Sequence, residues 1–63
     1  MNVALKQARE KACLTQVQVA DKANIPERSY QYYEAGERTP NTVTAVLIAN
    51  ILHSTVEELF NSA

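Results

Sequence analysis

The chain has 63 residues, which is enough for one small domain. With 46% hydrophobic and 21% charged residues it is too apolar for a disordered chain, and no apolar run reaches the roughly 20 residues that a membrane span needs. The formal net charge is −1, so bulk charge excludes a strongly basic surface but still allows a local basic patch. We expect a single domain over residues 1–63 and no association with membranes.

The one cysteine, Cys13, excludes an internal disulfide, and the one histidine, His53, adds no cluster of metal ligands. We therefore expect no metal site and no cofactor. Nothing in the sequence resembles a cleavable signal, and a single thiol is typical of a reducing compartment, so the expected location is the cytoplasm. Tight helix packing or self-association must then stabilise the small core.

Helix signals recur along the chain, whereas the two-residue alternation of strands is weak. Thr15 with Gln18 and Thr55 with Glu58 fit capping boxes, and Asn41 is a good N-cap before an apolar run. These signals predict five helices, at about 2–12, 15–23, 26–34, 41–52 and 55–61. Because the connections are short, sequential helices must cross at steep angles, and the sequence predicts a compact all-α domain.

The third predicted helix is bounded by residues with clear positional meaning. Pro26 lies near its start, where a missing N–H is harmless, and Gly36 suits a left-handed cap after its end. Helical spacing predicts that three residues point inward: Ile25, Tyr30 and Tyr33. The outward face is polar and is formed by Glu27, Arg28, Gln31 and Tyr32.

An ordered set of short motifs spans residues 14–36. They are Leu14-Thr15-Gln16, Val19-Ala20, Asn24, Tyr30 and Tyr33-Glu34-Ala35-Gly36. With these spacings the segment resembles the helix-turn-helix of the Cro and phage-repressor (Xre-like) family, and the resemblance extends over about residues 3–60. It implies a five-helix domain like that of the lambda repressor, in which the second and third helices form the helix-turn-helix.

The resemblance also implies a set of DNA contacts. In this arrangement the third helix enters the major groove, where arginine pairs with guanine, glutamine with adenine and glutamate with cytosine. The expected base-reading residues are Glu27, Arg28, Gln31 and Tyr32. The expected phosphate contacts are Gln16, Lys22, Ser29, Arg38 and Thr39. Arg9 and Glu34 match a pair that joins the first and third helices in the family, and we expect a partly buried salt bridge between them.

Several positions depart from the family pattern. Asn24 stands at a turn position where the family usually has glycine in a left-handed conformation. Asparagine tolerates this conformation better than most other residues. Cys13 and His53 also occupy helix ends that often hold glycine or another small residue. Pro26 replaces the usual Ser or Thr at the start of the third helix, which removes a side-chain cap.

The fourth predicted helix is apolar nearly all round. Its expected inward set is Ala45, Val46, Ile48, Ala49 and Leu52. Val43 and Leu47 are then left on the outside, and an exposed apolar stripe on a small domain indicates a partner surface. Repressors of this type pair through this region, so the predicted homodimer interface is Val43 and Leu47 with Val56 and Phe60, although the last two also fit the core of one copy.

Two functions remain open at this point. The first is a transcription regulator, expected to be a repressor, that binds a palindromic site in double-stranded DNA as a homodimer. The second is a protein-interaction module, such as an antitoxin-like or developmental regulator, with a protein partner. An enzyme is not expected, because the sequence offers no nucleophile–base pair, glycine-rich phosphate loop or clustered carboxylates. Residues 1–38 carry six basic and five acidic residues, so a single copy is expected to bind DNA modestly.

Overall fold

The structure is a computed structural model that describes residues 1–60. Its helices are α1 (Val3–Lys11), α2 (Gln16–Lys22), α3 (Glu27–Ala35), α4 (Thr42–Ile51) and α5 (Val56–Phe60). Residues 1–60 contain no strand, so the predicted all-α class is confirmed. The described helix boundaries lie within one residue of the predicted ones, and the predicted end of the fifth helix at residue 61 lies outside the described residues. None of the described helices is long and apolar enough to cross a membrane.

Local caps explain where the helices begin. At α2 the Thr15 hydroxyl accepts from the backbone N–H of Gln18 at 3.1 Å, and the Gln18 side chain accepts from the backbone N–H of Thr15 at 2.8 Å. At α4 the Asn41 side chain accepts from the backbone N–H of Thr44 at 2.8 Å. The predicted caps at Thr15 and Asn41 are confirmed, and Pro26 caps α3 without a side-chain hydrogen bond. At the start of α5 only half of the predicted capping box forms: the Thr55 hydroxyl accepts from the backbone N–H of Glu58 at 3.1 Å, but the Glu58 carboxylate accepts from that hydroxyl at 3.2 Å rather than from the Thr55 backbone N–H.

The ends of the first four helices share one turn geometry. In each, a residue with positive φ follows the helix. The backbone N–H of the residue after it donates to the carbonyl five residues earlier, which is the Schellman pattern. These residues are Cys13 (φ 60°), Asn24 (φ 57°), Gly36 (φ 78°) and His53 (φ 55°). These hydrogen bonds run from the N–H of Leu14 to the carbonyl of Arg9, and likewise from Ile25 to Ala20, from Glu37 to Tyr32 and from Ser54 to Ala49. Such tight reversals allow the short connections between helices.

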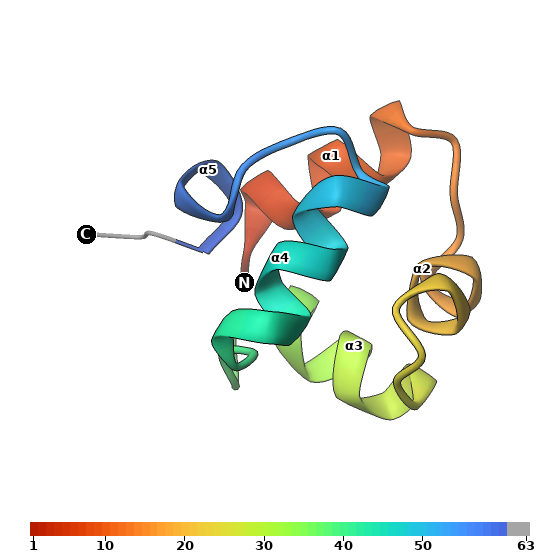
Figure 1. The fold of residues 1–63 in the computed structure, drawn as a ribbon, viewed down its shortest axis with the longest axis vertical. Coiled ribbons are helices and arrows are strands. Elements are labelled where there is room, and N and C mark those ends of the chain that lie inside the picture. The colour runs from red at the N-terminus through yellow and green to blue at the C-terminus, as the bar shows by residue number, and fades with distance from the viewer. Residues whose placement is uncertain (61–63) are drawn as a thin grey trace.

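The helices enclose one apolar core. In Figure 1 α4 crosses the middle of the molecule, α1 and α5 lie side by side above it, and α2 and α3 form the lower right corner. The fully buried side chains come from four helices and are Leu5, Val19, Tyr30 and Ile48. Asn2 joins the edges of this core, since its side chain donates to the Leu59 carbonyl at 2.7 Å and its backbone N–H donates to the Glu34 carbonyl at 2.9 Å.

The predicted inward face of α4 is wrong at one position. Ala45, Ile48, Ala49 and Leu52 are buried as expected, but Val46 is 43% exposed. The inward residues follow an i, i+3, i+4, i+7 spacing, which places Val46 on the flank, next to Val43 three residues earlier. The outer apolar stripe of α4 therefore consists of Val43, Val46 and Leu47.

Candidate nucleic-acid interface

Helices α2 and α3 form a helix-turn-helix with a polar outer face. The turn between them reverses at the left-handed Asn24, and α2 packs chiefly against α3. The inner side of α3 buries Tyr30, while Ile25 and Tyr33 pack partly buried against the core, as the helical spacing predicted. The outer face consists of Glu27, Arg28 and Gln31, which are exposed, and Tyr32, which is half-buried.

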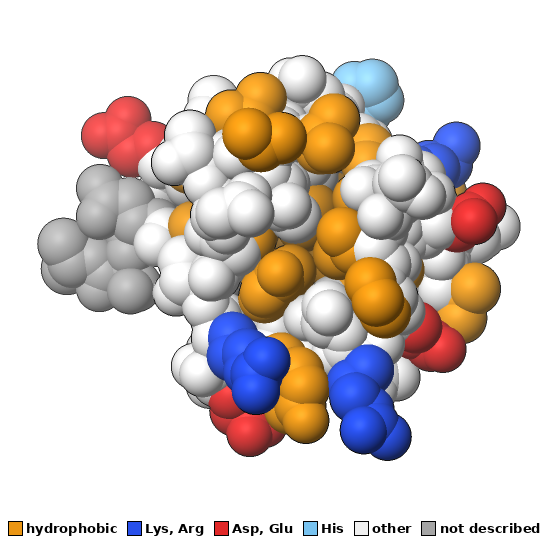
Figure 2. All heavy atoms as spheres, turned by 60° about the horizontal axis from the view of Figure 1, so that its bottom comes forward, with side chains coloured by type: hydrophobic (Ala, Val, Ile, Leu, Met, Phe, Trp, Pro, Cys, Tyr) orange, Lys and Arg blue, Asp and Glu red, His pale blue; other side chains and the backbone are white. Residues whose placement is uncertain are grey.

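Two of these outer side chains form a hydrogen bond with each other. The Gln31 amide donates to the Glu27 carboxylate at 3.3 Å, one turn apart along α3. Arg28 is exposed beside this pair in the first turn. Figure 2 turns this side of the molecule toward the viewer and shows few basic side chains, with acidic ones nearby. The face can therefore offer both donors and acceptors to base edges, but it offers little positive charge.

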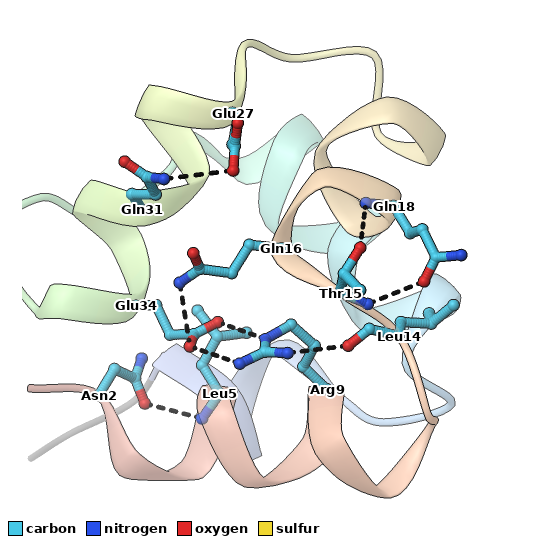
Figure 3. A network of polar contacts seen from close by, with 10 residues as sticks. All are labelled: Asn2, Leu5, Arg9, Leu14, Thr15, Gln16, Gln18, Glu27, Gln31 and Glu34. Atoms are coloured by element: carbon cyan, nitrogen blue, oxygen red, sulfur yellow. Dashed lines mark hydrogen bonds and ion pairs between the residues drawn. The ribbon is translucent and has the colours of Figure 1, made fainter.

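Behind the outer face, an ion pair joins α1 to α3 (Figure 3). Arg9 donates from Nε to Glu34 Oε2 at 2.9 Å and from Nη2 to Glu34 Oε1 at 3.1 Å, and its Nη1 donates to the Leu14 carbonyl at 2.8 Å. The two side chains are only 14% and 5% exposed, so the pair is the partly buried one that the resemblance implied.

Gln16 extends this network to the start of α2. Its amide Nε2 donates to Glu34 Oε1 at 3.3 Å, and Figure 3 shows its side chain directed from α2 toward Glu34 on α3. One N–H of the amide is therefore used inside the protein, and its second N–H is still available to a ligand. The network Arg9–Glu34–Gln16 thus connects all three helices around the candidate interface.

The network shifts the ionisation of its members. Burial acts to raise the pKa of Glu34, but the hydrogen bonds from Arg9 and Gln16 and the Arg9 charge outweigh it, so the pKa is lowered and the carboxylate is charged at neutral pH. The hydrogen bond to Glu34 raises the pKa of Arg9. Burial and the Glu34 carboxylate raise the pKa of Tyr30, whose hydroxyl is buried and makes no well-formed hydrogen bond within residues 1–60.

The other predicted phosphate contacts lie around the helix-turn-helix. Lys22 is exposed in the last turn of α2, and Ser29 is half-buried in the first turn of α3. Arg38 and Thr39 are exposed in the connection between α3 and α4. The Arg38 guanidinium lies over the Tyr32 ring, 4.6 Å from its centroid, a contact that the sequence did not predict.

The predicted dimer residues fall into two groups. Val43 and Leu47 are 72% and 41% exposed on the outer stripe of α4, which also includes Val46. Val56 and Phe60 are partly buried and pack against the core of the same copy. Within residues 1–60 no group of three or more His, Cys, Asp or Glu side chains is placed to hold a metal ion.

Comparison with known proteins places this architecture in a family. The model of the helix-turn-helix family matches residues 5–59. The chain belongs to the helix-turn-helix family. It is 40% identical over 55 residues to the uncharacterized HTH-type transcriptional regulator YqaE of Bacillus subtilis (strain 168), covering 87% of this chain and 47% of that protein. It is also 36% identical over 55 residues to the HTH-type transcriptional regulator ImmR of the same organism, covering 87% of this chain and 43% of that protein.

This helix-turn-helix chain spans about half the length of the curated relatives it matches. No solved structure matches it significantly. The matched residues 5–59 include α2, α3 and the Arg9–Glu34 pair, so the candidate interface lies wholly within the region shared with the family.

Proposed function

We propose that this chain is a sequence-specific DNA-binding domain of a transcription regulator. The observation that supports this most directly is the exposed face of α3, where Glu27, Arg28 and Gln31 project from a helix-turn-helix. The two Bacillus subtilis relatives are named HTH-type transcriptional regulators, which supports the same function. The opposite side of α3 is packed into the domain, because it buries Tyr30 and Glu34, and this fixes the orientation of the exposed face.

In the proposed complex the first turns of α3 lie in the major groove. Arg28 pairs with a guanine, and the Glu27–Gln31 pair reads a neighbouring base pair through its remaining donors and acceptors. Gln16 contacts a phosphate with its second amide N–H, while its first stays on Glu34. The uncapped first turn of α3 adds backbone N–H groups, and the remaining phosphate contacts are Lys22, Ser29, Arg38 and Thr39.

The same proposal includes a symmetric dimer and repression. The outer stripe of α4 supports pairing, since Val43, Val46 and Leu47 expose contiguous apolar surface on a 63-residue chain. A two-fold axis through such an interface sets two α3 helices about 34 Å apart, one DNA turn, and this selects a palindromic site. Occupying that site blocks transcription, so no effector site within the domain is needed for repression.

Selection from random duplex DNA tests the DNA-reading part. The unchanged protein should enrich one two-fold-symmetric site, and Arg28→Ala should weaken binding to it by about 1–3 kcal/mol and relax the selectivity at one base pair. Gln16→Ala should weaken binding on all duplexes alike, because a phosphate contact carries no sequence information. Lys11→Ala removes an exposed charge at the end of α1, away from α3, and serves as the matched control.

Failure of a folded protein to enrich any sequence would contradict DNA reading and would favour a protein partner instead. The dimer is tested separately by sedimentation of Leu47→Glu, which should shift the protein toward monomer while the circular dichroism spectrum stays helical. Val17→Glu places the same charge on the exposed side of α2 and should leave the sedimentation unchanged. If Leu47→Glu remained a dimer, the α4 stripe would not be part of the dimer interface.

A further inference from the structure

A cation–π stack closes one end of the recognition face. The Arg38 guanidinium lies 4.6 Å from the centroid of the Tyr32 ring, within the range of an attractive contact. Tyr32 is the last residue of the outer face of α3, and Arg38 lies three residues beyond the end of that helix. Tyr32 is half-buried, whereas Arg38 is exposed, so the ring is a fixed support beneath a charge that faces solvent.

The backbone of the turn produces this stack. The left-handed Gly36 reverses the chain, and the N–H groups of Glu37 and Arg38 both approach the Tyr32 carbonyl, at 3.0 and 3.4 Å. Arg38 is therefore anchored at the same residue whose ring its side chain covers. A Cβ at Gly36 would come within 3.1 Å of the Met1 backbone nitrogen, so the close approach of the N-terminus favours glycine in this turn.

Stacking leaves the guanidinium free to bind. The five N–H donors of arginine lie in the plane of the group, so a ring against its face leaves the donors at the edge available to a phosphate. Holding the side chain in one place also reduces the conformational entropy that binding would otherwise remove. The cost of this arrangement is that the covered face of the Tyr32 ring cannot contact a base.

We propose that Tyr32 is a positioning residue, whose ring holds the Arg38 guanidinium ready for a DNA phosphate at the C-terminal end of α3. This inference rests on the proposed function and changes the role expected for Tyr32, which the family resemblance placed among the base readers. A base reader affects affinity differently on different sequences. A platform for a phosphate contact affects affinity alike on all of them.

The test measures binding to the selected duplex and to versions of it with single base-pair changes, over a series of salt concentrations. Tyr32→Leu removes the ring and should weaken binding by about two- to fivefold on every duplex, the range of an exposed cation–π contact. For Tyr32→Leu, the slope of log K against log salt concentration should become shallower and approach that of Arg38→Ala. The full change expected for the loss of one phosphate contact per domain is about 0.9. Tyr32→Phe keeps the ring and should restore both the affinity and the salt dependence.

A double-mutant cycle then links the two residues. In the Arg38→Ala background, Tyr32→Leu should cost less than twofold, because the group that the ring positions is already absent. Circular dichroism and thermal unfolding of each variant establish that it is folded. Nuclear magnetic resonance gives a second measurement on the unchanged protein, in which the Arg38 side-chain protons should be shifted upfield by the ring and should lose this shift in Tyr32→Leu.

Any of three results would overturn the inference while leaving the proposed function intact. One is a loss in Tyr32→Phe equal to that in Tyr32→Leu and confined to one base pair, which would make the hydroxyl a base reader. The second is independent effects of Tyr32→Leu and Arg38→Ala in the double-mutant cycle. The third is the absence of the upfield shift in the free protein. If the unchanged protein binds no duplex DNA, the proposed function fails and the inference fails with it.

Discussion

Removing the carboxylate of Glu34 should destabilise the domain more than any exposed substitution. In Glu34→Leu, two Arg9 donors lose their acceptor in a place where the Arg9 side chain is only 14% exposed, and Gln16 loses its partner on α3. Only the hydrogen bond from Arg9 to the Leu14 carbonyl remains to satisfy the charge. Removing one partner of a buried pair costs about 3–5 kcal/mol, and the remaining exposure of Arg9 places the expected cost near the lower end, about 3 kcal/mol.

This cost is large relative to the whole stability of the domain. At about 0.05–0.15 kcal/mol per residue, 63 residues give a free energy of unfolding of roughly 3–9 kcal/mol. A loss of about 3 kcal/mol lowers the melting temperature by about 12–24 °C in a domain of this size. Thermal and urea unfolding followed by circular dichroism measures it, at one protein concentration because a dimer would add concentration dependence.

The double variant Arg9→Met with Glu34→Leu shows whether the uncompensated charge is the cause. Two apolar side chains of similar volume should restore most of the stability, to within about 1 kcal/mol of the unchanged protein. Glu37→Leu, an exposed acidic position in the next turn, should change stability by less than about 0.5 kcal/mol. A loss below about 1 kcal/mol in Glu34→Leu, or a double variant as unstable as the sum of its single variants, would refute the reasoning.

Three further predictions concern stability. The pKa of Glu34 is lowered from its ordinary value of 4.5, so the stability that its carboxylate contributes is present above pH 4.5 and is lost as the pH falls through the lower pKa of the folded state. The urea midpoint, measured between pH 2 and 6, should therefore fall on acidification, and it should fall less steeply in Glu34→Gln. Gly36→Ala should lose at least about 1–2 kcal/mol in urea unfolding, because φ is 78° and the new Cβ meets the Met1 backbone; an unchanged midpoint would contradict this. His53→Gly relieves a φ of 55° and should stabilise by about 0.5 kcal/mol after the entropy of glycine in the unfolded chain is counted, so a lower melting temperature would count against it.

Local signals predicted most of the fold. Thr15 and Asn41 locate the starts of α2 and α4 because a cap depends only on residues within one turn. Gly36 and Asn24 likewise mark their turns through their own backbone preferences. The Arg9–Glu34 contact joins residues 25 positions apart, and only the family resemblance suggested it. Local chemistry therefore predicted the helix boundaries, whereas the family pattern was needed for the pairing between helices.

The missed features depend on how elements pack in three dimensions. Helix α4 is apolar nearly all round, so its sequence leaves the inward direction ambiguous, and the pattern wrongly predicts that Val46 is buried. The side chain of Asn2 reaches the Leu59 carbonyl, 57 residues away, which no local pattern indicates. The stack of Arg38 on Tyr32 requires the reversal of the chain at Gly36. The sequence indicates that turn, but it does not indicate that the turn places the Arg38 side chain over the Tyr32 ring.

The sparse charge of the candidate interface makes pairing important for the proposed function. One copy offers three basic side chains around α2 and α3, namely Lys22, Arg28 and Arg38, and Glu27 on the same face repels phosphates. In the proposed complex Arg28 pairs with a base, so Lys22 and Arg38 are the charged phosphate contacts. If each of these two neutralises one phosphate, the slope of log K against log salt concentration is about −2 for one domain and about −4 for two. Pairing through the α4 stripe would double these contacts on one site, because the second domain binds at the high effective concentration that the first creates. The salt slope on the selected site therefore reports how many domains are bound, and a slope near about −2 on a two-fold-symmetric site would contradict binding as a dimer.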